Sequence, residues 1–212
     1  MRLTIFGATG ATGTSLTDQA LAAGHEVTAV VRDAARLAVP AHMRLQIVTA
    51  DVMDPASIAP AVEGADAVIS AIGPRAGTGA RTVIQDSVRS IIAAMDKTGA
   101  RRFVQVSGSI VADDGESLYM RYLVKPLARR TFLRHVCADM RVAEEEIRRS
   151  GLDWTILRPP ALTAKPATGT YRTALDRNLP HGFQVTRADL AACMLALLND
   201  PATVQRRVSI AN

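Results

Sequence analysis

A glycine-rich turn, Gly7-Ala8-Thr9-Gly10-Ala11-Thr12-Gly13, stands near the start of the chain between an apolar segment and a helical pattern. Three glycines at three-residue spacing favour a tight turn whose backbone can approach a pyrophosphate, and a side chain at Gly10 would obstruct that approach. The N-terminus of the following helix adds free N–H groups and positive dipole. The other interpretation is an ordinary turn rich in small residues, which this spacing makes the weaker one.

Basic residues follow the second apolar segment, where dinucleotide-binding proteins recognise the ribose of their cofactor. The chain reads Val30-Val31-Arg32-Asp33 there, and Arg36 follows shortly after. A planar guanidinium suits a phosphate, so Arg32 predicts NADP(H) through its 2′-phosphate. Asp33 keeps an NAD ribose open as an alternative if the strand ends one residue later.

The segments that must position these residues alternate between strand and helix patterns. The expected strands are Arg2 to Phe6, Glu26 to Val31, Arg44 to Thr49, Ala67 to Ala71, Arg102 to Val106, Trp154 to Leu157 and an edge strand at Arg207 to Ile210. The expected helices are Thr12 to Ala23, Thr82 to Thr98, Met140 to Arg149 and Ala188 to Leu198. Such alternation predicts an α/β fold, a doubly wound Rossmann fold with a mainly parallel sheet flanked by helices.

No repeat or break in composition divides the chain, so residues 1–212 are expected to form one domain. Ligands of open α/β sheets bind at the carboxyl ends of the strands. The loose segments 112–138 and 159–182 follow such ends. They are therefore expected to form the substrate pocket.

The composition excludes several function classes. Hydrophobic residues make up 48% and charged residues 21%, and the formal charge of +5 is scattered, so we expect no nucleic-acid partner. Cys137 and Cys193 have no metal-ligand or redox spacing and are expected to be buried, with no metal site. No leader pattern and no apolar run of about 20 residues is found, so we expect a cytoplasmic protein without membrane contact.

Several short motifs together resemble an atypical short-chain dehydrogenase/reductase, most nearly the NADPH-dependent flavin reductase/biliverdin reductase B group among NmrA-like proteins. Besides the segments already named, these are Asp51-Val52, Ala71-Ile72-Gly73, Val106-Ser107 and Leu157-Arg158-Pro159-Pro160. The later Thr168-Gly169-Thr170-Tyr171 and Leu175-Asp176 are similar to that group and are more specific than the glycine turn.

The resemblance implies a set of cofactor contacts that runs from the pyrophosphate to the nicotinamide. The pyrophosphate would lie on Gly7, Thr9, Gly10, Thr12 and Gly13, and the 2′-phosphate on Arg32 and Arg36. The adenine would lie beside Asp51 and Val52, the ribose and diphosphate beside Ile72, Gly73 and Arg75, and the nicotinamide beside Ser107, Pro159 and Pro160.

The chain departs from the relatives in its proton donors. The classical Tyr-x-x-x-Lys pair is absent, because Leu123, Pro126 and Leu175 stand four residues after the three tyrosines. Ala161 stands where the flavin/biliverdin group commonly has histidine, which weakens a biliverdin substrate. The remaining catalytic candidates are Ser107 and Ser109, after the fifth strand. Hydride transfer to a flavin needs only alignment of two rings, with the balancing proton from solvent.

These observations predict an NADPH-dependent oxidoreductase that transfers hydride to a flavin, quinone or similar planar acceptor. A redox-sensing regulator that binds NADP(H) without turnover is the alternative, and a sugar epimerase or dehydratase would normally need a larger C-terminal region. We expect a small-molecule partner and a monomer or weak homodimer.

Overall fold

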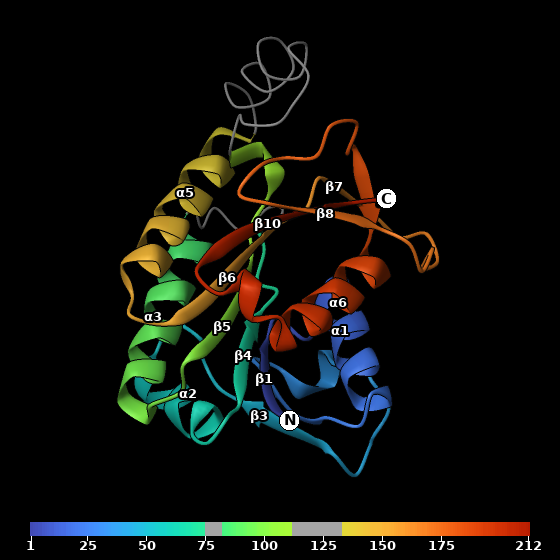
Figure 1. Ribbon diagram of the computed structural model, residues 1–212. Coiled ribbons are helices and arrows are strands. Elements are labelled where there is room, and N and C mark those ends of the chain that lie inside the picture. Colours follow the sequence, from blue (N-terminus) through green and yellow to red (C-terminus); the bar gives the residue numbers. More distant parts are fainter. Residues whose placement is uncertain (75–81, 112–132) are drawn as a thin grey trace.

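The computed structural model describes residues 1–74, 82–111 and 133–212. Its main sheet has eight strands in the order β3-β2-β1-β4-β5-β6-β10-β8, and β7 pairs with β9 separately (Figure 1). The strands are β1 (Arg2–Phe6), β2 (Glu26–Val31), β3 (Leu45–Thr49), β4 (Ala67–Ser70), β5 (Arg102–Val106), β6 (Asp153–Arg158), β7 (Ala161–Thr163), β8 (Arg172–Leu175), β9 (Gln184–Thr186) and β10 (Arg206–Ala211). The neighbouring pairs from β3 to β10 are parallel, which confirms the predicted Rossmann-type fold.

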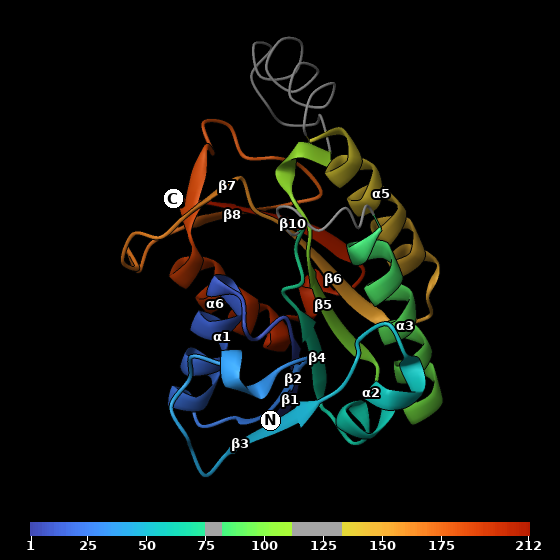
Figure 2. The ribbon, with the colours of Figure 1, turned by 180° about the vertical axis from the view of Figure 1, so that it is seen from behind.

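Helices cover both faces of the sheet (Figures 1 and 2). They are α1 (Ala11–Ala22), α2 (Pro55–Val62), α3 (Val83–Thr98), α5 (Arg134–Arg149) and α6 (Arg187–Ala196), with 3-10 turns η1 (Ala34–Arg36), η2 (Ser109–Val111), η4 (Leu197–Asn199) and η5 (Pro201–Thr203). Leu3 and Ile5 of β1 pack with α1 and α6, whereas Phe6 packs with α2, α3 and α5. The strands are apolar on both sides because both faces are buried.

The C-terminal strand lies inside the sheet, so the prediction of an edge strand there was wrong. β10 pairs with β6 in parallel and with β8 in antiparallel orientation. The edge strand on this side of the sheet is β8, which the sequence analysis did not predict. Its side chains are mostly exposed, so it lacks the apolar run by which a buried strand is identified.

Helix α5 begins at Arg134, six residues before the predicted start at Met140. Its first turns carry few buried residues, and one of them is Asp139, whose carboxylate accepts hydrogen bonds from the backbone N–H groups of Ile84 and Gln85, both at 2.9 Å. This aspartate therefore caps α3 from another helix. Burial raises the pKa of Asp139, although the two hydrogen bonds oppose that shift.

Cys137 and Cys193 are both buried, as predicted. Burial raises the pKa of the Cys193 thiol to about 12, so this group is a packing residue rather than a nucleophile. None of the helices in the described ranges is both long enough and apolar enough to cross a membrane.

Candidate functional site

The glycine turn joins β1 to α1 at the carboxyl edge of the sheet, as predicted. Gly7 has a φ of +81°, and a Cβ there would lie 2.8 Å from the Ala71 carbonyl carbon. A Cβ on Gly13 would lie 2.1 Å from the Gly7 carbonyl oxygen and 2.8 Å from the Ala8 Cα. Both glycines are therefore required by the close approach of backbone segments, whatever the turn binds.

Gly10 differs from these two glycines, because the fold alone does not require it. Its φ is −84°, and among the described residues an added Cβ would meet only the Gly7 carbonyl oxygen, at 3.3 Å. Gly10 is the N-cap of α1, where no side chain in the described part of the chain forms a cap hydrogen bond and no acidic residue occupies the first turn. The N-terminal N–H groups and the positive end of the dipole are thus left for a ligand, and they fit the anionic pyrophosphate of a dinucleotide.

Two exposed arginines stand beyond the carboxyl end of β2. The strand ends at Val31, so Arg32 directly follows it, and Arg36 ends the short turn η1. Asp33 caps this turn, since its carboxylate accepts a hydrogen bond of 3.0 Å from the Ala35 N–H. Neither arginine forms a salt bridge with another described residue. This arrangement favours the arginines over Asp33 as the ribose-selecting side chains.

The residues expected beside the adenine lie after β3. The Asp51 carboxylate accepts a hydrogen bond of 3.0 Å from Met53 N–H, and its carbonyl accepts one of 2.9 Å from Ser57 Oγ. Val52 is half-buried against the core under α2 and α3. Asp51 therefore stabilises its own turn, and its contact with adenine stays a prediction.

The segment after β4 was expected to line the ribose and diphosphate. Ile72 is partly buried against the core under α2 and α3. Gly73 is exposed, and no atom of the described residues lies within 4 Å of the position of an added Cβ. Arg75 lies outside the described residues, so its predicted role stays a prediction.

Ser107, expected beside the nicotinamide, belongs to a buried polar cluster that sequence reasoning missed. Its hydroxyl donates a hydrogen bond of 2.7 Å to Oε1 of Glu144, on α5. Arg158, the last residue of β6, donates from Nε to the same oxygen at 3.0 Å and from Nη2 to Oε2. The sequence analysis noted Arg158 as part of Leu157-Arg158-Pro159-Pro160. It missed the pairing with Glu144, because no sequence spacing indicates that a strand arginine contacts a helix glutamate.

The loops after β5 and β6 are joined at the same edge of the sheet. The Ser107 N–H donates to the Leu157 carbonyl and the Ser109 N–H to the Pro159 carbonyl, both at 2.8 Å. Pro159 is buried and Pro160 half-buried. The structure thus brings Ser107, Ser109, Pro159 and Pro160 together, as the nicotinamide assignment requires.

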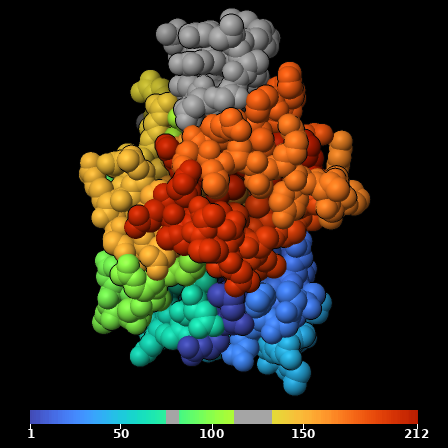
Figure 3. Space-filling view, viewed as in Figure 1, coloured from blue at the N-terminus to red at the C-terminus, as the bar shows by residue number. Residues whose placement is uncertain are grey.

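Of the two segments expected to form the substrate pocket, the structure describes only a small part of the first and the whole of the second. Residues 112–132 of the first segment lie outside the described residues, Leu133 is the N-cap of α5, and 134–138 form the start of that helix. Segment 159–182 is described throughout, and in Figure 3 its orange surface covers the upper part of the molecule. A separate hollow of about 400 Å³ lies at the opposite, amino edge of the sheet, so we do not assign the site there.

Asp189 at the start of α6 anchors segment 159–182. Its carboxylate accepts hydrogen bonds from Thr168, Gly169, Thr186 and Asn212, between 2.8 and 3.1 Å. Its exposed fraction is only 1%. Burial would raise the pKa of Asp189, but hydrogen bonds from Thr168, Thr186 and Asn212 outweigh burial and lower the pKa to about 2.

Asp189→Asn is expected to lower the free energy of unfolding by about 2 kcal/mol at neutral pH. The reason is that folding lowers the pKa of Asp189 from 3.8 to about 2, and one pKa unit corresponds to about 1.4 kcal/mol. A carboxylate with a lowered folded-state pKa stabilises the fold above pH 3.8, and this contribution is lost as the pH falls toward 2. Urea unfolding between neutral pH and pH 3 measures the difference.

The matched control is Asp54→Asn, at the exposed N-cap of α2, where asparagine caps as well as aspartate. This control should change the free energy of unfolding by less than about 0.5 kcal/mol. An equal loss in both variants would contradict the special role of Asp189.

Comparisons with known proteins identify the family of the chain. A family model described as NAD(P)H-binding matches residues 7–201. The UPF0659 protein YMR090W of Saccharomyces cerevisiae is 31% identical over 73% of this chain, and the match covers 66% of that protein. The chain thus spans just under two thirds of that relative's length.

Solved structures are similar over the whole chain. The anaerobilin reductase ChuY of Escherichia coli O157:H7 is 29% identical, with a TM-score of 0.78, covering 100% of this chain and 97% of that one. A short-chain dehydrogenase/reductase of Veillonella parvula, solved in complex with NADP, is 21% identical, with a TM-score of 0.83, covering 100% of this chain and 94% of that one. At that identity the second likeness shows the fold alone.

Proposed function

Since the chain belongs to the NAD(P)H-binding family, we propose that it is an oxidoreductase that transfers hydride from NADPH to a flavin, quinone or similar planar acceptor. The observation that carries the proposal is the N-terminus of α1 behind Gly10, which no side chain of the described residues caps, together with the exposed Arg32 and Arg36 beyond the neighbouring strand β2. The family match confirms the expected nicotinamide cofactor. The choice of NADPH over NADH rests on the two arginines.

The backbone of the glycine turn would bind the pyrophosphate, and the Arg32 and Arg36 guanidinium groups would bind the 2′-phosphate. Ser107, Ser109 and the Pro159-Pro160 backbone would border the nicotinamide. When bound, NADPH supplies a hydride, and the proton that completes reduction of the acceptor comes from solvent. The protein would align the two rings.

The acceptor class rests on two observations. The chain has no Tyr-x-x-x-Lys pair, so the usual proton donor for reduction of a carbonyl is missing. A planar conjugated acceptor does not need such a donor. The likeness to an anaerobilin reductase supports an acceptor of this kind.

The proposal is tested by following NADPH oxidation, without oxygen, against a panel of flavins, quinones and linear tetrapyrroles. NADPH affinity is measured in parallel by calorimetry. We expect turnover with at least one planar acceptor and a preference for NADPH over NADH. Gly10→Val, purified in the same way, serves as the control for contaminating reductases.

A redox sensor would use the same cofactor site, and the same panel distinguishes it. Tight NADPH binding with no oxidation by any acceptor would favour the sensor over the enzyme. Absence of NADPH binding would contradict the assignment of the glycine turn itself.

A further inference from the structure

The Ser107 hydroxyl has only one hydrogen, and the structure shows where it goes. The Oγ lies 2.7 Å from Glu144 Oε1 and donates to it. Ser107, Glu144 and Arg158 are 7%, 5% and 5% exposed, so little water reaches this bond. Whatever meets Ser107 from the cofactor side therefore finds only the lone pairs of its oxygen.

Arg158 makes this orientation obligatory. Its Nε and Nη2 groups donate to the two carboxylate oxygens of Glu144, in the bidentate geometry that an arginine and a carboxylate favour. A carboxylate paired in this way only accepts hydrogen bonds. The Ser107 hydroxyl must then donate, because the Glu144 carboxylate has no hydrogen to donate to it.

We propose that Glu144, held by Arg158, is a positioning residue that makes Ser107 a hydrogen-bond acceptor at the nicotinamide end of the site. The substrate is then a planar acceptor that carries a ring N–H, such as a flavin, rather than a quinone. This inference rests on the proposed reductase function. A substrate carbonyl that faced Ser107 would place its oxygen against the Ser107 Oγ, so two acceptors would face each other without a hydrogen between them. A ring N–H in the same position would donate a hydrogen bond to the Ser107 Oγ.

The arrangement differs from a serine that donates its hydrogen to a substrate carbonyl. Ser107 follows β5, and Arg158 ends the neighbouring strand β6, so both stand at the carboxyl edge of the sheet where the glycine turn also lies. Glu144 reaches both residues from α5, which packs on the face of the sheet that α2 and α3 also cover. Three elements therefore set the direction of one hydroxyl.

The test compares riboflavin with N3-methylriboflavin, which lacks the ring N–H of the oxidised flavin. Affinity for each is measured by flavin fluorescence with NADP⁺ present, so no turnover is needed. The unaltered protein is expected to bind riboflavin about 2-fold to 10-fold more tightly than the methylated analogue, the range of one neutral hydrogen bond. Ser107→Ala should remove most of that preference while leaving the Glu144–Arg158 pair in place.

Glu144→Leu tests the positioning role. A leucine of similar volume offers no acceptor to the Ser107 hydroxyl, so the serine hydrogen is released toward the site and the preference for riboflavin should fall as in Ser107→Ala. A ratio of two affinities does not depend on the folded fraction, which guards against the instability of an unpaired Arg158. Ser150→Ala removes a hydroxyl that bonds the Ile147 carbonyl at the far end of α5, and it should keep the preference.

Two results would overturn the inference alone: equal affinity of the unaltered protein for the two flavins, or an unchanged preference in Ser107→Ala. In steady-state assays, a higher kcat/KM for quinones than for flavins would do so as well. Turnover of no acceptor at all would instead contradict the proposed function, and the two failures are thus distinguishable.

Discussion

Gly13→Ala is expected to lower the free energy of unfolding by at least about 3 kcal/mol, the upper range for overpacked sites. The added Cβ would lie 2.1 Å from the Gly7 carbonyl oxygen and 2.8 Å from the Ala8 Cα. Both neighbours are backbone atoms, so α1 must move away from the turn. Urea-induced unfolding followed by circular dichroism measures the loss.

Gly10→Val is the matched change in the same turn, with the opposite expected outcome. The site has an extended backbone conformation, and the described residues place a single atom, at 3.3 Å, near the added Cβ, so the fold should lose only about 1 kcal/mol at this N-cap. Affinity for NADPH and NADH should fall together by at least about tenfold, because the side chain occupies the pyrophosphate approach. Unchanged affinity in a folded variant would disprove the turn assignment.

Arg32→Ala is expected to weaken NADPH binding by about tenfold to a hundredfold and NADH binding hardly at all. A hydrogen bond to a charged group contributes about 1.5 to 3 kcal/mol, and only NADPH carries the 2′-phosphate. The exposed Arg32 forms no salt bridge with a described residue that would compensate its loss. Calorimetric titration with both cofactors, at one fixed salt concentration, gives the ratio.

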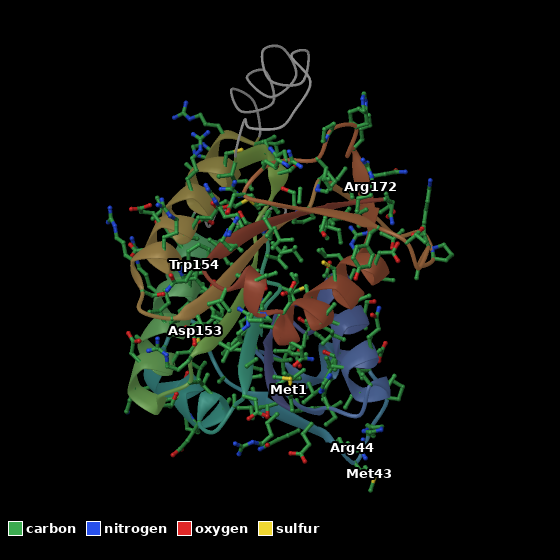
Figure 4. All side chains as sticks on the ribbon, viewed as in Figure 1. Met1, Met43, Arg44, Asp153, Trp154 and Arg172 are labelled. Carbon is green, nitrogen blue, oxygen red and sulfur yellow. The ribbon has the colours of Figure 1, made fainter. Side chains whose placement is uncertain are left out.

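Arg44→Ala controls for the loss of one positive charge. This arginine is exposed at the amino end of β3, and Figure 4 shows it beside Met43 at the end of the molecule opposite Arg172. It should leave the NADPH to NADH ratio within about twofold, since exposed charges beyond about 10 Å are screened. If Arg32→Ala weakened the two cofactors equally, the 2′-phosphate assignment would be wrong.

The parallel strands and the glycine turn were predictable because their signals are local. Buried strands read as apolar runs, and the turn needs glycine where backbone segments approach closely. The predicted ends of the main elements mostly lie within one or two residues of those observed. The start of α5 was missed because Asp139, a buried polar residue, interrupts the apolar pattern while it caps α3.

The sequence by itself determined the fold class, the nicotinamide cofactor and the place of the glycine turn, since each depends on residues close together along the chain. Only the tertiary structure decided that β10 lies inside the sheet and that Asp189 anchors Thr168 and Asn212. It also decided the direction of the Ser107 hydrogen bond, through Glu144 and Arg158. Such pairings join residues far apart in sequence, and a hydrogen bond acquires its direction only when donor and acceptor meet in space.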